Sequence, residues 1–273
     1  AVTDVSLAFA SLVAHILAPA PLQEDVVSLT LHADSANTIR LAGESAPVVL
    51  SAASLERESG AVLLVEGGPF GDADVDQLRF VTPPTLLGGD GAEGSASRSI
   101  VPLVVGDQRE LGESVRASVG LVTYDENVGV TLLDEQTEYA PDVVSGVTST
   151  DNVRLTTAIN NIDAPTAVNA LFLDVGGSLA GGGTLAVTSG NVLANDAAAA
   201  IDVATLELTA SEAMIWTAED LTITADLAAS VDLVKAGPKT LTLTGRTTVP
   251  GEASVLAGTL VVAGGLVQAE MLQ

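Results

Sequence analysis

Acidic side chains provide the first candidate for chemistry in this sequence. Asp72, Asp74 and Asp76 stand at alternate positions in a turn, as the ligands of a calcium loop do. The EF-hand pattern also requires glycine at its sixth position and glutamate at its twelfth, where this chain has Gln77 and Pro83. Calcium is therefore the metal prediction for these three residues, and a turn of solvated acids is the alternative.

The other reactive residue types form no catalytic pattern. Asp163 and Asp174 could serve as the carboxylate pair of a polysaccharide-acting enzyme, but a chain with 35 acidic residues contains many such pairs. The two histidines, His15 and His32, have no serine and aspartate at a spacing that suggests a triad. The absence of cysteine removes disulfides, thiolate metal sites and cysteine nucleophiles together. The sequence predicts no catalytic residue, and no cofactor other than calcium.

The charge balance restricts the partners. With 10 basic residues and a formal net charge of −25, the chain repels phosphate backbones, so nucleic acid is excluded as a partner. The same charge opposes anionic lipid headgroups. The apolar stretch over residues 5–18 is too short to span a bilayer, and the sequence therefore predicts no membrane insertion by this chain.

The elements that must position these residues read as strands. Short runs rich in valine, leucine and isoleucine are separated by glycine, serine, asparagine or aspartate, which is typical of an all-β chain. The clearest runs recur roughly every 15–20 residues, as in a solenoid, and cover residues 169–174, 183–189, 204–210, 220–226, 239–245 and 258–264. Their alternation predicts an inward-facing set of Leu171, Leu185, Leu206, Leu208, Leu221, Ile223, Leu241, Leu243, Leu260 and Val262.

The first 25 residues differ from the rest. Residues 5–18 can form a helix capped by Asp4 and stopped by Pro19, or equally a strand or an arm that packs on a neighbouring molecule. From residue 26 to 273 the sequence predicts a single β-solenoid domain, with loop excursions near 68–98 and 107–150. A soft boundary falls near residues 140–152.

One segment is similar to a known family. Residues 232–265 resemble the autotransporter-associated β-strand repeat, with Lys235, Gly237 and Gly258 among the matching positions and departures at Lys239 and Val249. Weaker similarity extends over most of residues 40–265. The resemblance implies a right-handed parallel β-helix that is secreted and displayed on a bacterial cell surface.

These observations predict a non-enzymatic, extracellular structural protein, a β-solenoid subunit that associates with itself, end to end, into a fibre, filament or layer. An adhesin passenger that binds glycan or protein is the first alternative, although aromatic residues make up only 3% of the chain. A polysaccharide-acting β-helix enzyme is the second, disfavoured by the few basic residues. The predicted self-association contacts are apolar residues near the two ends: Phe9, Leu12, Val13, Ile16, Leu260, Val262 and Leu266.

Overall fold

A computed structural model describes residues 5–7, 11–16, 22–43, 46–68, 70, 74–108, 118–144 and 146–268. All regular structure in these residues is β-strand, so none of them forms a helix that could cross a membrane. The chain divides into two compact units. Unit 1 comprises residues 1–86 and 100–133, and unit 2 comprises residues 87–99 and 134–273. Each unit is a parallel β-helix, which confirms the predicted fold class.

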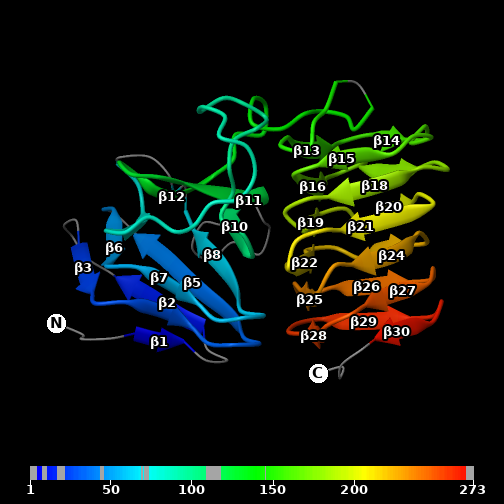
Figure 1. The fold of residues 1–273 in the computed structure, drawn as a ribbon. Coiled ribbons are helices and arrows are strands. Elements are labelled where there is room, and N and C mark those ends of the chain that lie inside the picture. The colour runs from blue at the N-terminus through cyan, green and yellow to red at the C-terminus, as the bar shows by residue number, and fades with distance from the viewer. Residues whose placement is uncertain are drawn as a thin grey trace. The chain divides into compact units, whose positions relative to one another are not determined.

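Unit 2 is a three-sided stack of six coils, which run from β13–β15 to β28–β30 in Figure 1. The first sheet contains β13 (Asn152–Leu155), β16 (Ala170–Leu173), β19 (Asn191–Ala194), β22 (Glu212–Thr217), β25 (Asp232–Ala236) and β28 (Ala253–Val255). The second contains β14 (Ala158–Ile159), β17 (Ser178–Ala180), β20 (Ala199–Asp202), β23 (Leu221–Ile223), β26 (Thr240–Leu243) and β29 (Thr259–Val262). The third contains β15 (Thr166–Val168), β18 (Thr184–Val187), β21 (Thr205–Leu208), β24 (Asp226–Ala229), β27 (Thr247–Val249) and β30 (Leu266–Gln268).

The coils of unit 2 stack in parallel register around an aliphatic core. Paired residues lie between 18 positions apart, as in Val153 and Leu171, and 23 apart, as in Val192 and Ile215. The predicted inward-facing residues from Leu171 to Leu243 are all buried in this core, which confirms that part of the set. Leu260 and Val262 pack against the core but remain partly exposed.

Aspartates at the corners tie successive coils of unit 2 together. The carboxylates of Asp220, Asp226 and Asp232 each accept a hydrogen bond from a backbone N–H 20 residues further on, at 2.8, 3.0 and 2.8 Å. Asp196 accepts backbone hydrogen bonds from Ala198 and Gly176, which together hold its pKa below the usual range. Part of the acidic composition therefore has a structural cause.

Unit 1 contains three coils and an antiparallel extension. One side contains β1 (Val5–Leu7), β4 (Leu29–Leu31) and β7 (Leu55–Arg57). The second contains β2 (Ser11–Ile16), β5 (Ala36–Gly43), β8 (Val62–Gly67), β10 (Val104–Gln108), β11 (Ser118–Asp125) and β12 (Gly129–Leu132). The third contains β3 (Leu22–Val26), β6 (Val48–Ala52) and β9 (Gln77–Phe80). All pairs are parallel except β10–β11 and β11–β12.

The predicted N-terminal helix is wrong for the residues that the structure describes. Strands β1 and β2 pair in parallel with β4 and β5 of the same chain, and so belong to the first coil of unit 1. The strand alternative therefore holds. Backbone pairing with β4 and β5 extends the sheets of unit 1, and this tertiary pairing outweighs the helical spacing of the apolar residues.

The division into units differs from the single domain expected over residues 26–273. The sequence analysis assigns residues 107–150 to a loop excursion, whereas this stretch contains β11 and β12, which extend a sheet of unit 1. Unit 2 resumes at residue 134, close to the soft boundary near residues 140–152. Residues 120–124 read as a strand in the sequence, but the glycine and acidic residues around them gave no sign of its pairing with β12.

Candidate functional sites

The outer face of β3, β6 and β9 in unit 1 carries a row of polar side chains. Asp25, Ser51 and Arg79 are paired in register across the three strands. Leu50 and Phe80 are buried beside them, so the alternation of a strand directs Ser51 and Arg79 away from the core. These residues line a hollow of about 510 Å³.

A hairpin completes the hollow. The turn between β11 and β12 is held by Asp125, whose carboxylate accepts a hydrogen bond from Asn127 N–H at 2.7 Å. The backbone oxygen of Glu126 accepts a hydrogen bond from the Arg79 guanidinium at 3.1 Å. Gly129 permits this approach, because its φ is +87° and a Cβ there would lie 2.2 Å from the Leu78 oxygen.

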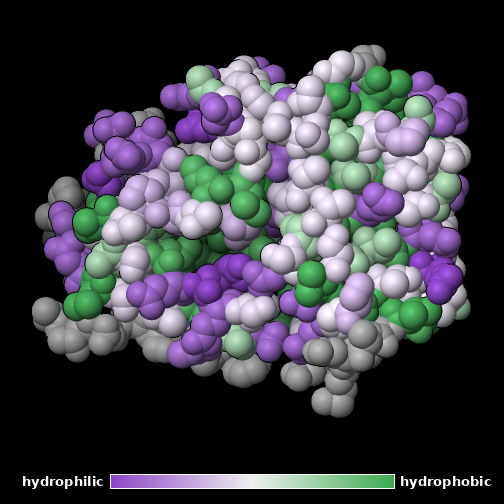
Figure 2. Space-filling model, in the orientation of Figure 1, coloured by the Kyte–Doolittle hydropathy of each residue, from purple (hydrophilic) through white to green (hydrophobic). Residues whose placement is uncertain are grey.

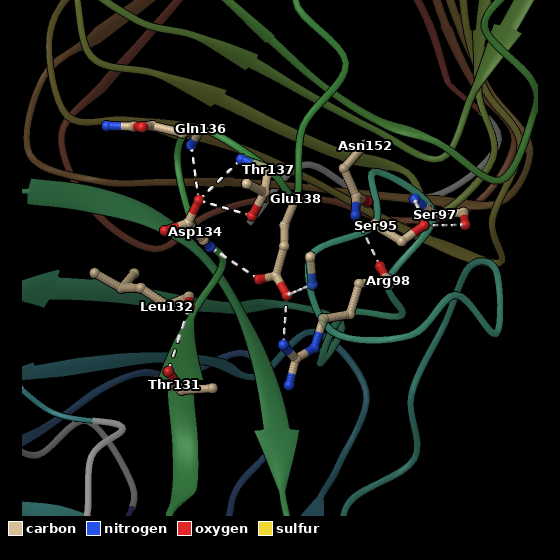
Figure 3. Close-up of polar contacts among 11 residues, drawn as sticks. Ser95, Ser97, Arg98, Thr131, Leu132, Asp134, Gln136, Thr137, Glu138 and Asn152 are labelled. Atoms are coloured by element: carbon tan, nitrogen blue, oxygen red, sulfur yellow. Dashed lines mark hydrogen bonds and ion pairs between the residues drawn. The ribbon is translucent and has the colours of Figure 1, made fainter.

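A second polar cluster caps the first coil of unit 2 (Figure 3). The Glu138 carboxylate pairs with Arg98 and accepts hydrogen bonds from Gly94 N–H and Asp134 N–H, both at 2.9 Å. Its side chain is 2% exposed. Ala140 then forms a parallel bridge to Val153 of β13. Residues 87–99 and 134–140 thereby cover the sheet edge that β13 would otherwise present.

An aspartate in the same cap accepts local hydrogen bonds. The Thr137 hydroxyl and the Gln136 N–H donate to the carboxylate of Asp134 at 2.8 and 3.0 Å, and they hold its pKa below the usual range. Asp134 and Glu138 are therefore engaged as acceptors within the cap. The backbone hydrogen bonds that the two carboxylates accept from Asp134, Gln136 and Gly94 support a structural role in the cap.

Asp174, half of the carboxylate pair considered from the sequence, is also engaged. Arg154 donates to its carboxylate through Nε at 3.0 Å, and the amide of Asn195 donates at 3.0 Å. The Arg154 guanidinium also contacts Glu135 at 2.8 Å and lies 5.9 Å from the centre of the Phe172 ring. This arrangement fixes neighbouring coils to each other.

Lys235 is a buried amine inside unit 2. Its strand position lies in register between Ile215 and Val255, which directs the side chain into the core. The ammonium group donates to the backbone oxygens of Ala236, Gly237 and Ala257 at 3.0, 2.7 and 2.8 Å. Burial lowers the pKa of Lys235 to about 8. A deprotonated lysine can act as a nucleophile, but this one is 1% exposed and its amine is held by backbone oxygens at a corner of the coil.

The lowered pKa of Lys235 predicts a pH-dependent stability. Because the unfolded chain binds the proton more tightly, unfolding takes up a proton between pH 8 and 10.5, and the free energy of unfolding rises with pH in that window. The shift corresponds to a cost of about 3 kcal/mol for keeping Lys235 charged in the folded state. This cost is fully present below pH 8. Urea titrations followed by the fluorescence of Trp216, the single tryptophan, measure it.

Lys235→Met is the matched variant for this measurement. We expect its free energy of unfolding to be flat between pH 8 and 10.5 once the titration of other groups, common to both proteins, is subtracted. Equal slopes in parent and variant would show that Lys235 keeps an ordinary pKa.

The structure gives only part of the predicted calcium site. Asp72 lies outside the described residues, and Asp74 is exposed. Asp76 is buried and accepts hydrogen bonds from Gly43 N–H and Val48 N–H at 3.1 and 2.8 Å. Among the described residues, no group of three or more acidic or histidine side chains could hold a metal ion. Asp76 therefore has a structural role, and calcium binding by the full turn stays a prediction.

The predicted self-association residues lie in the terminal coils. Phe9 is outside the described residues, while Leu12, Val13 and Ile16 belong to β2, an edge strand of its sheet. Leu260 and Val262 lie on β29, another edge strand. Leu266, on the edge strand β30, is 36% exposed. Hydrophobic surface is visible over this last coil in Figure 2.

Sequence reasoning missed the hollow, the cap and the buried lysine. The hollow depends on residues 25, 51 and 79, whose intervals of 26 and 28 residues differ from the period of the clear C-terminal repeats. Glu138 has no feature in the sequence that distinguishes it from the other acidic residues. Lys235 was noted as a motif position, and the glycines that follow it were the available signal of a tight, buried corner.

The fold defines the class of this chain as a parallel β-helix protein. No protein-family model, no curated protein and no solved structure matches the chain. The similarity of residues 232–265 to the autotransporter-associated repeat therefore stays a prediction.

Proposed function

We propose that this chain is a non-enzymatic structural protein, displayed outside the cell, whose β-helix extends by end-to-end association with further copies. The extracellular placement follows from the resemblance of residues 232–265 to the autotransporter-associated repeat. The engagement of Glu138, Asp174 and Lys235 by neighbouring groups supports a scaffold rather than a catalyst.

One observation carries the proposal: the last coil of unit 2 presents open strand edges. Ala140 bridges the edge of the first sheet at β13, whereas β28, β29 and β30, like β14 and β15, are each an edge strand of their sheet among the described residues. The stacked side chains of the core also become more exposed in this last coil. Leu243 is 1% exposed and its partner Val262 is partly exposed. Unpaired strand edges with apolar side chains favour pairing with another β-layer.

Assembly should depend on ionic strength. The net charge of −25 opposes contact between copies, and salt screens that repulsion. We expect the mean mass in light scattering to rise with sodium chloride, and negative-stain images to show elongated polymers. Calcium should strengthen assembly further if the turn containing Asp72, Asp74 and Asp76 binds it between copies, and a chelator should reverse that increment.

A charged edge provides the test. Leu260→Lys combined with Val262→Lys places two ammonium groups on the exposed coil, and we expect this variant to stay monomeric at high salt. Val175→Lys, at an exposed turn elsewhere in unit 2, is the control and should assemble like the parent. A parent chain that stays monomeric at high salt, with and without calcium, would contradict the proposal.

A further inference from the structure

We propose that the hollow over β3, β6 and β9 of unit 1 is a binding site for a neutral oligosaccharide. The site uses side chains that the proposed assembly does not require, so the two proposals stand or fail separately. It rests on three features of the hollow: mixed polar groups, neighbouring exposed apolar residues and an open surface that carries charges of both signs.

The polar row offers both donors and acceptors. Asp25 accepts hydrogen bonds, Arg79 donates them, and the hydroxyl of Ser51 between them does both. Arg79 donates to a backbone oxygen and forms no ion pair with any described residue, so its remaining N–H groups are available. Strands are about 4.8 Å apart, which places Asp25 and Arg79 roughly 10 Å from each other. Hydroxyl groups along linked sugar rings can donate and accept across that distance.

An apolar row runs beside the polar one. Val27, Ala53 and Val81 directly follow Val26, Ala52 and Phe80, which are paired in register. Val27 is 56% exposed and Val81 is 82% exposed, and exposed Pro83 also lines the hollow. All three lie in the bends that directly follow β3, β6 and β9, and Val81 is the one of them that lines the hollow.

This juxtaposition matches the amphipathic surface of a sugar ring. The C–H face of the ring can pack on Val81 and Pro83 while its hydroxyl groups reach the polar row. The exposed side chains of Val81 and Pro83 do not contribute to the core. The inward positions of β6 and β9 are filled by Leu50, Leu78 and Phe80.

Charge selects a neutral ligand. The hollow contains Asp25 and Glu126 as well as Arg79, and the chain as a whole carries −25, so a polyanion is repelled. The one aromatic residue of the lining, Phe80, is buried and provides no stacking surface. We therefore expect a dissociation constant on the order of 0.1–1 mM for a short oligosaccharide. Exposure to solvent suits binding rather than bond cleavage, which benefits from excluded water.

The test uses the full chain and a defined panel of probes. Neutral hexasaccharides of β-1,4-glucan, α-1,4-glucan, β-1,4-mannan and chitin are compared with hexagalacturonate by saturation-transfer NMR and calorimetry. We expect at least one neutral hexasaccharide to bind. Asp25→Ala, Arg79→Met and Val81→Asp should each weaken that binding about tenfold or more, the effect of losing one charged hydrogen bond or the apolar contact.

Controls separate the site from the fold. Asp25 and Val81 are exposed, so their replacement leaves the core of unit 1 intact, which circular dichroism melting verifies. Val175→Asp, an exposed valine in unit 2, should bind like the parent. Three outcomes would overturn the proposal: no neutral probe binds at millimolar concentration, hexagalacturonate binds in preference, or the Asp25 and Arg79 variants bind as tightly as the parent.

Discussion

Leu243→Asp is expected to unfold unit 2 under conditions in which the parent chain is folded. Leu243 lies in β26 with Ile223 and Val262 as its register partners, and its side chain is 1% exposed. The substitution removes a buried aliphatic group, which costs about 2–5 kcal/mol, and places an unpaired carboxylate in the core. Because a solenoid is held together by contacts between neighbouring coils, the loss reaches the coils on both sides.

Trp216 reports this effect. It lies buried in β22, in the coil that precedes the substituted one, so its emission follows the packing of that part of unit 2. Thr244→Asp is the control, since Thr244 is the adjacent residue and is exposed. Its free energy of unfolding should stay within about 0.5 kcal/mol of the parent. If Leu243→Asp shifts the urea midpoint no more than Thr244→Asp, the assignment of Leu243 to the core is wrong.

Glu138→Ala is expected to open the cap of unit 2. The substitution leaves the charge of Arg98 without its partner and removes the acceptor of the Gly94 and Asp134 N–H groups. Breaking a buried ion pair by removing one partner costs about 3–5 kcal/mol. We expect the amides of residues 140, 152 and 154, which hydrogen-bond between the cap and β13 or within them, to exchange about 100- to 1,000-fold faster with deuterated solvent.

Glu135→Ala is the matched control for the cap. Glu135 pairs with Arg154 but is 43% exposed, and an exposed ion pair contributes only about 0–1 kcal/mol. The double variant Arg98→Met with Glu138→Gln should recover much of the protection, because it removes the unpaired charge. Unchanged exchange in Glu138→Ala would mean that the bridge between Ala140 and β13 holds without the ion pair.

The β-strands could be predicted from alternation, and their stacking into a solenoid from the regular recurrence of the clear runs. Leu206 and Leu208, or Leu221 and Ile223, alternate with polar residues, and this spacing directs one set inward whatever the neighbours are. The six clear segments all contain strands. Their assignment to sheets could not be predicted, because alternation is the same on every side of a coil. The structure places one of them in the first sheet of unit 2, three in the second and two in the third.

The candidate sites could not be predicted, for a different reason. Asp25, Ser51 and Arg79 are unremarkable in sequence, and the stacking of three coils brings them into one row. Glu138 and Arg98 lie 40 residues apart, on two segments that meet over β13. Their roles depend on register between coils, and register is set by the packing of whole layers.

The sequence by itself determined the β-strand content, the inward and outward faces of most strands and the acidic composition. These follow from properties of single residues and of near neighbours. The tertiary structure decided that residues 5–7 and 11–16 add strands to a coil instead of forming a helix, and that residues 118–132 extend unit 1. It also decided that Lys235 lies among backbone oxygens inside the core. Backbone hydrogen bonds in a β-helix join residues about 20 positions apart, so their partners are chosen by the stack and not by local sequence.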